Sequence, residues 1–417
     1  MEYTDFFDES YDPTDDDLVC TFRLVPGTGF SVGEAASRVA SESSNGTWAA
    51  LDPQSDVRSY SAIAFDVGST DEYGSEIRIA YPIALFEEGS LPQILSCIAG
   101  NIMGMKAVET IRLLDCEWPE SIVRSFPGPQ FGSTVRTELL DTAARPPLAT
   151  VPKPKVGLST DEHAQIGYDA WTGGVDLLKD DENLTDQSFN PFEQRVTESF
   201  EARDRAESET GERKGYLVNI TAETDEMIRR AEYVVDHGGS FVMIDIITVG
   251  WSGLETVRRR TEDLDVAIHA HRAMHAAFDR LPQHGVSMRC LAQFARLAGV
   301  DHIHTGTAGL GKLENEDTAG INEWLRSDLY GLKDVLPVAS GGLHPGIVDQ
   351  LLDALGTDVM VQAGGGVHGH PDGTEAGAQA LRAAVEAYVD GESLQSRAES
   401  TPALATALEK WGTEGPR

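Results

Sequence analysis

A lysine followed by acids ends one apolar run of the sequence, in residues 173–183 (GGVDLLKDDEN). Side chains alternate along a strand, so Lys179 and Asp181 can point the same way, and Glu182 can join them from the following loop. Carboxylate oxygens suit a hard cation such as Mg2+. A lysine fits beside that cation if its amine is neutral and has captured CO2 as a carbamate, an anionic oxygen ligand. A salt bridge between Lys179 and the acids is the alternative, and the residues alone leave both open.

Two further lysines end another apolar run, in residues 153–159 (KPKVGLS). If the strand continues through them, Lys153 and Lys155 face the same side and repel each other unless an anion lies nearby. A phosphate or a developing carbanion would fit there. Burial would also lower the pKa of a lysine, which proton transfer near neutral pH requires.

Histidines end two more runs, in residues 269–275 (HAHRAMH) and 302–304 (HIH). Histidines at strand ends can act as general acids or bases, or bind phosphate. A single histidine in a core is more often a hydrogen-bonded structural residue. We expect that plainer role for His269, His275 and His302.

Glycine-rich segments follow the last three runs. Residues 305–314 (TGTAGLGKLE) combine three glycines with Lys312, as in a lid that delivers a charge when it closes. Residues 340–342 (SGG) and 362–366 (QAGGG) allow backbone N–H groups to approach an anion. Because two such turns follow consecutive runs, with basic groups across from them, the pattern suggests a bisphosphate ligand.

The apolar runs themselves recur beyond residue 125 with amphipathic segments between them. The eight strand candidates are residues 149–156, 175–178, 216–220, 241–246, 266–269, 302–304, 336–339 and 359–362, and the helical segments include 222–237, 288–298 and 345–355. Eight β–α repeats over roughly 290 residues match a (β/α)8 TIM barrel, in which chemistry sits where strands end. An open doubly wound sheet is the alternative, but the glycine-rich GxGxxG turn that it should show after its first strand is absent.

The first part of the chain mixes the two element types. Residues 18–24 and 77–82 are predicted strands, and residues 32–41 and 91–100 are predicted helices. A segment rich in proline and glycine, 126–132 (FPGPQFG), then breaks the pattern. We therefore predict an α/β protein with an α+β N-terminal domain over residues 1–125 and a catalytic barrel over residues 126–417.

Composition limits the binding partners and the cellular compartment that we expect. The net charge of −35 repels nucleic acid and anionic membranes, so neither is an expected partner. No apolar stretch is long enough to span a membrane, and the acidic N-terminus is unlike a signal peptide, so we expect a cytoplasmic protein. The four cysteines are scattered, which argues against disulfides and structural zinc. Only eight of the 33 basic residues are lysines, and an acidic, lysine-poor surface suggests a halophilic archaeon.

Taken together, these segments resemble those of the ribulose-1,5-bisphosphate carboxylase/oxygenase (RuBisCO) large chain family. The resemblance rests on residues 153–159, 173–183, 271–276 (HRAMHA), 304–314 and 340–342, and on 42–48 (ESSNGTW) and 100–106 (GNIMGMK) in the N-terminal part. It covers nearly the whole chain. The VPKPK variant, the AGLG lid and the short C-terminus are similar to the archaeal form III branch, which needs no small subunit.

The resemblance implies an activity and its cofactors. A carbamate formed from CO2 on Lys179 would bind Mg2+ with Asp181 and Glu182, and would take the proton from carbon 3 of ribulose 1,5-bisphosphate. CO2 would attack the resulting metal-held enediolate, giving two 3-phosphoglycerate molecules, with O2 attack as an oxygenase side reaction. Lys312 would close over the new carboxylate, and Lys153 would protonate the last carbanion with help from His271.

The resemblance also implies binding residues and a metabolic setting. Substrate contacts would come from Lys155, Arg272, His304, Ser340, Gly341, Gly342, Gln362, Ala363, Gly364 and Gly365. Glu42, Thr47, Trp48 and Asn101 would reach into a partner's active site, so a homodimer or an assembly of dimers is expected. The form III branch implies service in AMP and nucleotide-ribose salvage. A threonine phosphate contact is in doubt, because Thr150 stands three places before Lys153 instead of two.

Three other functions compete with this one. A RuBisCO-like enolase or isomerase would stop at the enolate, yet Glu42, Asn101, Lys312 and Ser340 all persist here. A carbamate-bridged metal hydrolase would carry its HxH motif on the first barrel strand, whereas residues 269–271 stand on the fifth. A non-catalytic sugar-phosphate-binding barrel would have no use for the cluster at Lys179.

Overall fold

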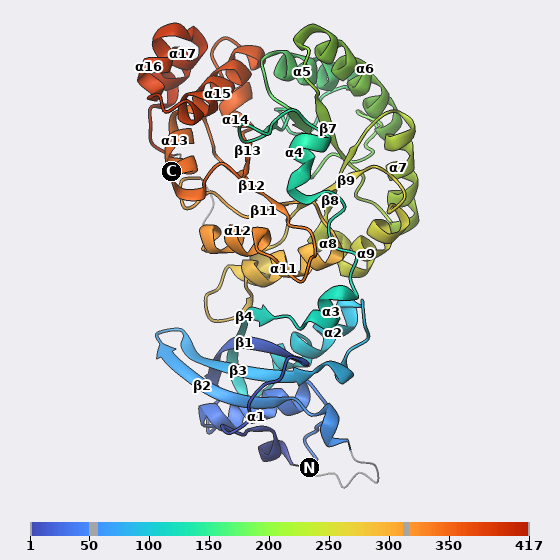
Figure 1. Ribbon diagram of the computed structural model, residues 1–417, viewed down its shortest axis with the longest axis vertical. Helices are drawn as coiled ribbons and strands as arrows, with labels where there is room; N and C mark the ends of the chain where they lie inside the picture. The colour runs from blue at the N-terminus through green and yellow to red at the C-terminus, as the bar shows by residue number, and fades with distance from the viewer. Residues whose placement is uncertain (1, 50–56, 312–316, 416–417) are drawn as a thin grey trace. The chain divides into compact units, whose positions relative to one another are not determined.

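The computed structural model describes residues 2–49, 57–311 and 317–415, and its chain forms two compact units (Figure 1). The first unit comprises Met1–Pro127, Met274–Ala298 and Asp328–Leu332. The second comprises Gly128–Ala273, Gly299–Ser327 and Lys333–Arg417. In the described part of the chain, no helix combines the length and the apolar character needed to cross a membrane.

The first unit is built on a mixed sheet with the strand order β10-β4-β1-β3-β2. Its strands are β1 (Asp17–Pro26), β2 (Ile63–Asp71), β3 (Gly74–Pro82), β4 (Val108–Glu117) and β10 (Gly285–Val286). The pairs within β4-β1-β3-β2 are antiparallel, and β10 joins β4 in parallel. The predicted strands at 18–24 and 77–82 are confirmed, whereas β2 and β4 were not predicted.

The helices of this unit are short. They are α1 (Val32–Glu42), α2 (Leu91–Ile98), α3 (Glu120–Arg124), α10 (Ala276–Asp279) and α11 (Met288–Ala298), with 3-10 turns at Tyr3–Phe6, Arg58–Tyr60, Ile83–Leu85 and Asn101–Gly104. A capping box between Ser31 and Glu34 starts α1. The predicted helix 288–298 is confirmed as α11, which belongs to this compact unit. Trp118, next to β4, contacts Phe294 and Gln293 of α11.

The second unit contains the predicted (β/α)8 barrel, closed in the order β11-β12-β13-β5-β6-β7-β8-β9 with every neighbouring pair parallel. The strands are β5 (Leu148–Thr150), β6 (Leu177–Lys179), β7 (Gly215–Asn219), β8 (Phe241–Asp245), β9 (Ala267–His271), β11 (His302–His304), β12 (Leu336–Ser340) and β13 (Met360–Gln362). The helices are α4 (Val135–Glu138), α5 (Thr160–Thr172), α6 (Phe192–Thr210), α7 (Thr224–Asp236), α8 (Ile246–Val249), α9 (Trp251–Arg260), α12 (Thr318–Arg326), α13 (Val348–Leu355), α14 (Gly365–His368), α15 (Thr374–Val389), α16 (Leu394–Ser400) and α17 (Pro402–Trp411), with 3-10 turns at Gly132–Thr134 and Pro345–Ile347. All eight predicted strands are present.

Apolar side chains fill the barrel, as the strand alternation requires. One buried cluster joins Leu177, Leu217 and Phe241 of three successive strands to Phe131 and Val135, which precede the first strand. A second cluster lies between β13 and the C-terminal helices α13, α15 and α17. These contacts fix the strand ends that carry the polar side chains.

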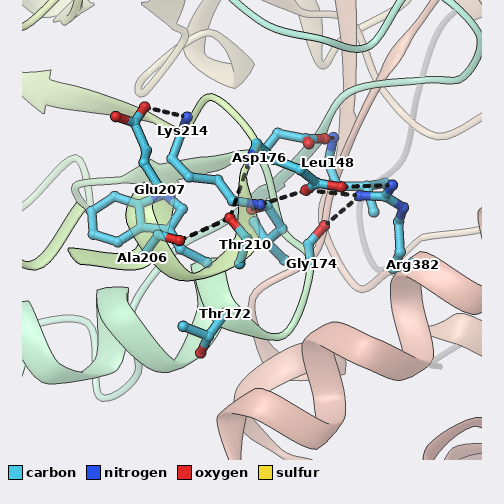
Figure 2. A network of polar contacts seen from close by, with 12 residues as sticks. Leu148, Thr172, Gly174, Asp176, Ala206, Glu207, Thr210, Lys214 and Arg382 are labelled. Carbon is cyan, nitrogen blue, oxygen red and sulfur yellow. Dashed lines mark hydrogen bonds and ion pairs between the residues drawn. The ribbon is translucent and has the colours of Figure 1, made fainter. Parts of the chain in front are cut away.

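A network of paired charges lies where β5, β6 and β7 begin. Arg145 donates to both carboxylate oxygens of Asp176 at 2.6 Å, and the N–H of Leu148 donates to the same carboxylate at 2.7 Å. Lys214, buried just before β7, donates to the carbonyl of Val175 at 3.2 Å and to Glu212 at 2.8 Å. Figure 2 shows Lys214, Asp176 and Arg382 converging on this region. The network joins three neighbouring strands at the amino end of the barrel.

Candidate functional site

The site is built from the inward-facing side chains at the carboxyl ends of the barrel strands. On β6, the alternation that places Leu177 inside also places Lys179 inside, with its side chain 0% exposed. The Lys179 Nζ donates to the carbonyl of Asp180 at 2.7 Å and lies 4.0 Å from Glu182 Oε2. Burial lowers the pKa of Lys179, although the charges of Glu182 and Asp181 oppose that shift.

The two predicted metal-binding acids, Asp181 and Glu182, contact different partners. Asp181 Oδ2 lies 3.2 Å from the Nζ of Lys153, and Asp181 Oδ1 accepts hydrogen bonds from Asn183. Glu182 Oε2 lies 3.5 Å from the Nε2 of His271. Burial alone would raise the pKa of Asp181, but the bonds from Asn183 and the charge of Lys153 outweigh it and hold that pKa below its usual value. These contacts bring Lys153 to Asp181, and bring Lys179 and His271 to Glu182.

The intervening residue, Asp180, points outward and anchors the strand end. Its buried carboxylate accepts hydrogen bonds from Tyr216 Oη at 2.6 Å and from the N–H of Asn219 at 2.9 Å. It also lies 3.2 Å from His163 and 3.3 Å from Arg195. Burial would raise the pKa of Asp180, but these partners bring it down to about 2. Because Asp180 is held from the helix side, Lys179 and Asp181 are fixed on the inner side.

Two polar residues that the sequence analysis did not select also support the site. Asn219, the last residue of β7, donates its side-chain amide to the carbonyls of Asp181, Glu182 and Leu184 at 3.4, 3.4 and 2.9 Å. Asp245, the last residue of β8, lies 2.7 Å from the Nδ1 of His271. Each is the last polar residue of a strand that was predicted one residue too long, at 216–220 and 241–246, so a search that allowed for that shift would have found both.

The histidines of β9 and β11 meet inside the barrel. The Nδ1 of His304 lies 2.5 Å from Ser340 Oγ at the end of β12, and its Nε2 lies 2.8 Å from the Nε2 of His269. Burial holds the pKa of His304 well below its usual value. Arg272 follows β9 and is 7% exposed. His302 is buried at the start of β11 and stacks on Phe241, while His275 lies 2.6 Å from Asp279 in the first unit.

The lysine-rich segment differs in detail from its prediction. The strand expected over 149–156 ends at Thr150, so Lys153 and Lys155 lie in a loop and alternation does not relate them. Lys153 reaches Asp181, whereas Lys155 is exposed. The hydroxyl of Thr150 donates to the carbonyl of Ala363 at 2.7 Å and is fully buried. The Thr150 hydroxyl proton is therefore already donated to the backbone just after the neighbouring strand β13.

The glycine segments lie in the loops after β11, β12 and β13. Gly341 and Gly342 both have left-handed backbones, with φ of 108° and 90°. A Cβ on Gly364 would approach the Lys153 side chain to 3.0 Å, so the glycine lets that lysine pass. The N–H of Ala363 donates to the carbonyl of Ala149 within the sheet, and Gln362 is buried beside it. Gly365 begins α14. Lys312 lies outside the described residues.

The remaining candidates belong to the first unit. Asn101 donates to one carboxylate oxygen of Glu42 at 3.4 Å, and Tyr3 donates to the other at 3.3 Å. Thr47 is half-buried, and Trp48 is 84% exposed. The structure thus brings Glu42 and Asn101 together.

Comparison with known proteins identifies the family. Residues 132–411 match the family described as ribulose bisphosphate carboxylase large chain, catalytic domain, and residues 5–122 match its N-terminal domain. The ribulose bisphosphate carboxylase of Pyrococcus furiosus is 51% identical over 419 residues, covering 100% of this chain and 99% of the relative.

Solved structures agree with that match. The octameric RuBisCO of Pyrococcus horikoshii OT3, in complex with sulfate ion, is 49% identical with a TM-score of 0.95, over 99% of this chain and 97% of the other. The dimeric archaeal RuBisCO of Hyperthermus butylicus is 45% identical with a TM-score of 0.93, over 99% of both chains. The chain belongs to the ribulose bisphosphate carboxylase large chain family of enzymes, alongside archaeal members.

Proposed function

We propose that the chain joins CO2 and water to ribulose 1,5-bisphosphate and cleaves the product into two molecules of 3-phosphoglycerate. The observation that carries this proposal is Lys179. Its amine is fully buried at the mouth of the barrel, its pKa is lowered by burial, and the carboxylates of Asp181 and Glu182 follow it within three residues. Its short hydrogen bond goes to a carbonyl, and the nearest carboxylate oxygen among the described residues, in Glu182, is 4.0 Å away, at the limit of an ion pair.

A neutral Lys179 can be activated by CO2. Its nitrogen lone pair forms a bond to the carbon of CO2, and the amine releases one proton, which leaves an anionic carbamate. The donor set then consists of hard oxygens from that carbamate, Asp181 and Glu182, which fits Mg2+. Bound there, Mg2+ would polarise the oxygens of the sugar and make the hydrogen on carbon 3 more acidic.

Neighbouring side chains can move protons and hold the substrate. His271 is oriented by Asp245 at its Nδ1, which leaves its Nε2 on the Glu182 side to accept or donate a proton. Lys153, next to Asp181, can donate a proton to a carbanion at the mouth. His304, Ser340 and the nearby loops after β12 and β13 offer donors to phosphate. We assign substrate binding to Lys155, Arg272, His304, Ser340, Gly341, Gly342, Gln362, Ala363, Gly364 and Gly365.

We propose further that the active site is completed by a second copy of the chain. Exposed Trp48 and the paired Glu42 and Asn101 are the residues assigned to that contact, together with Thr47. The related proteins are a dimer and an octamer, which supports a homodimer or an assembly of dimers without a small subunit. We assign closure over the new carboxylate to Lys312. The predicted division of the chain into an N-terminal domain over residues 1–125, which makes this contact, and a catalytic barrel over residues 126–417 is part of the same proposal.

The wider setting is also a proposal. We place the activity in AMP and nucleotide-ribose salvage, as the resemblance to the archaeal form III branch implies, with attack by O2 as a side reaction. The charge of −35, with eight lysines among 33 basic residues, supports a salt-rich cytoplasm. We expect the melting temperature to fall as KCl is reduced below about molar concentration, because screening of the acidic surface is lost. A melting temperature independent of KCl would contradict the proposal of a salt-rich cytoplasm.

The decisive experiment supplies ribulose 1,5-bisphosphate and 14C-bicarbonate after preincubation with CO2 and Mg2+. We expect labelled 3-phosphoglycerate, and little activity if either activator is omitted. Exchange of the hydrogen on carbon 3 without 14C fixation would instead favour the enolase or isomerase. Lys312→Ala should keep that exchange while losing fixation, and loss of both would refute the assignment of Lys312.

A further inference from the structure

Three side chains form a polar line from the mouth of the barrel into its interior. Ser340 ends β12, His304 ends β11, and His269 lies in the middle of β9. Ser340 Oγ lies 2.5 Å from His304 Nδ1, and His304 Nε2 lies 2.8 Å from His269 Nε2. Both histidines are buried, and the rings stand perpendicular to each other, 4.8 Å apart. His269 is fully buried in the middle of its strand, and the proposed function gives it no role.

The contact between the two histidines restricts where their protons can be. Two imidazole nitrogens at this distance form a hydrogen bond only if one of them carries a hydrogen. Burial holds the pKa of both His269 and His304 well below the usual value, so both rings are neutral and each carries one N–H. The proton positions of the two rings and the Ser340 hydroxyl are therefore linked.

Two arrangements satisfy this restriction. In the first, His269 donates from Nε2, His304 carries its hydrogen on Nδ1 and donates to Ser340, and the Ser340 hydroxyl proton stays available. In the second, His304 donates to His269, and the Ser340 hydroxyl must donate to His304 Nδ1. The Nδ1 of His269 has no hydrogen-bond partner among the described residues in either case. The Nδ1 of His269 is therefore unpaired in both arrangements, so a bound ligand decides which of the two is populated.

An anion at Ser340 distinguishes the two arrangements. In the second arrangement it would meet the lone pairs of the serine oxygen, whereas in the first it receives a hydrogen bond. We propose that His269 donates its Nε2–H to His304 and thereby directs the Ser340 hydroxyl proton toward a phosphate of the substrate. His269 is thus a positioning residue for anion binding. This inference rests on the proposed function, in which His304 and Ser340 hold a phosphate.

Matched substitutions separate the hydrogen bond from packing. His269→Leu removes the donor, while His269→Gln keeps an N–H near the position of Nε2. His302→Leu is the control, because His302 is equally buried on the neighbouring strand and neither of its ring nitrogens has a partner in the described structure. The readouts are KM for ribulose 1,5-bisphosphate, the inhibition constant of inorganic phosphate, and kcat.

We expect His269→Leu to raise both KM and the inhibition constant about tenfold, as for a lost hydrogen bond to a charged group, with a smaller change in kcat. His269→Gln and His302→Leu should stay close to the wild type in both constants. Equal effects of His269→Leu and His269→Gln, or of His269→Leu and His302→Leu, would overturn the proposal.

A measurement on the unmodified enzyme does not depend on folding of the variants. Neutron diffraction, or 15N NMR of histidine-labelled protein, with inorganic phosphate bound should place the His304 hydrogen on Nδ1. A hydrogen on His304 Nε2 would overturn the inference even if the enzyme is active. Failure of the wild type to fix 14C-bicarbonate would refute the proposed function instead, so the two failures are distinguishable.

Discussion

The two ends of the barrel hold their buried lysines in opposite ways. At the amino ends, Asp176 is bonded to Arg145 through both carboxylate oxygens, and buried Lys214 has Glu212 at 2.8 Å. At the carboxyl ends, equally buried Lys179 has its nearest carboxylate oxygen at 4.0 Å. A buried amine without a close carboxylate favours its neutral form, which is the form that can react. We call the amino end the paired end, because its buried lysine has a close carboxylate, and the carboxyl end the chemical end.

Replacing one buried lysine at each end by methionine tests this comparison with the largest expected effect. We expect Lys179→Met to lower carboxylation at least about 1000-fold, a barrier increase of about 4 kcal/mol, because the proposed carbamate cannot form. The free energy of unfolding should stay the same or rise, since a poorly paired amine is removed.

Lys214→Met is the matched control at the other end. It should lower the free energy of unfolding by about 2 kcal/mol, because the carbonyl of Val175 and the carboxylate of Glu212 lose their donor. The kcat of the folded enzyme should not change. Denaturant titration and steady-state kinetics on both variants test the contrast, and a loss of stability in Lys179→Met as large as in Lys214→Met would erase it.

The Arg145–Asp176 pair tests whether pairing of buried charges at the amino end stabilises the fold. Asp176→Ala leaves a buried guanidinium without its carboxylate, so we expect a loss of about 3–5 kcal/mol in unfolding free energy. The double variant Arg145→Met, Asp176→Leu should recover much of that loss. Urea unfolding of the three proteins measures both effects, and a double variant no better than the single one would contradict the account.

Asn219 tests the support of the chemical end. Asn219→Ala removes the amide that holds the carbonyls of residues 181, 182 and 184, so the carboxylates of Asp181 and Glu182 lose their fixed positions. We expect the Mg2+ concentration for half-maximal activation to rise about tenfold. Asn322→Ala, at a buried asparagine on α12, is the control and should leave that concentration unchanged.

The smallest expected effect concerns acid stability at the paired end. Burial would raise the pKa of Glu212, but Lys214 and Arg382 hold it below the model-peptide value of 4.5. Because the folded pKa is the lower one, this stabilisation is present above the unfolded pKa and is lost as pH falls through the folded pKa. Glu212→Gln should therefore flatten the loss of melting temperature below about pH 4.5, and cost at most about 1 kcal/mol at neutral pH. An unchanged acid slope would show that Glu212 is not responsible.

The sequence could predict the chemical end better than the paired end. Alternation along β6 was enough to place Lys179 inside the barrel, although the strand ends there and Asp181 follows it. Strand counting was enough for the barrel. The end of β5 at Thr150 was predicted too late, although Pro152 and Pro154, which cannot donate to a sheet ladder, stand just beyond it. Asn219 and Asp245 were missed because the predicted strands 216–220 and 241–246 ran one residue past them.

The paired end depends on contacts that no local pattern carries. Arg145 and Asp176 are 31 residues apart, and Arg382 reaches Glu212 across 170 residues. The same holds for the pair of His269 and His304, which are 35 residues apart and meet only because β9 and β11 are neighbours. Local periodicity predicts which face a residue occupies, but the strand order decides which residue it meets.

Strand β10 has a consequence for how the protein is made. It pairs Gly285 with Arg112 of β4, and α11 follows it directly, so part of the first unit comes from far along the chain. On the ribosome, β4 therefore waits with an open edge until residue 298 has emerged. An expressed fragment that stops at residue 127 would keep that edge and tend to aggregate. The N-terminal region is first in synthesis but cannot be first to finish folding.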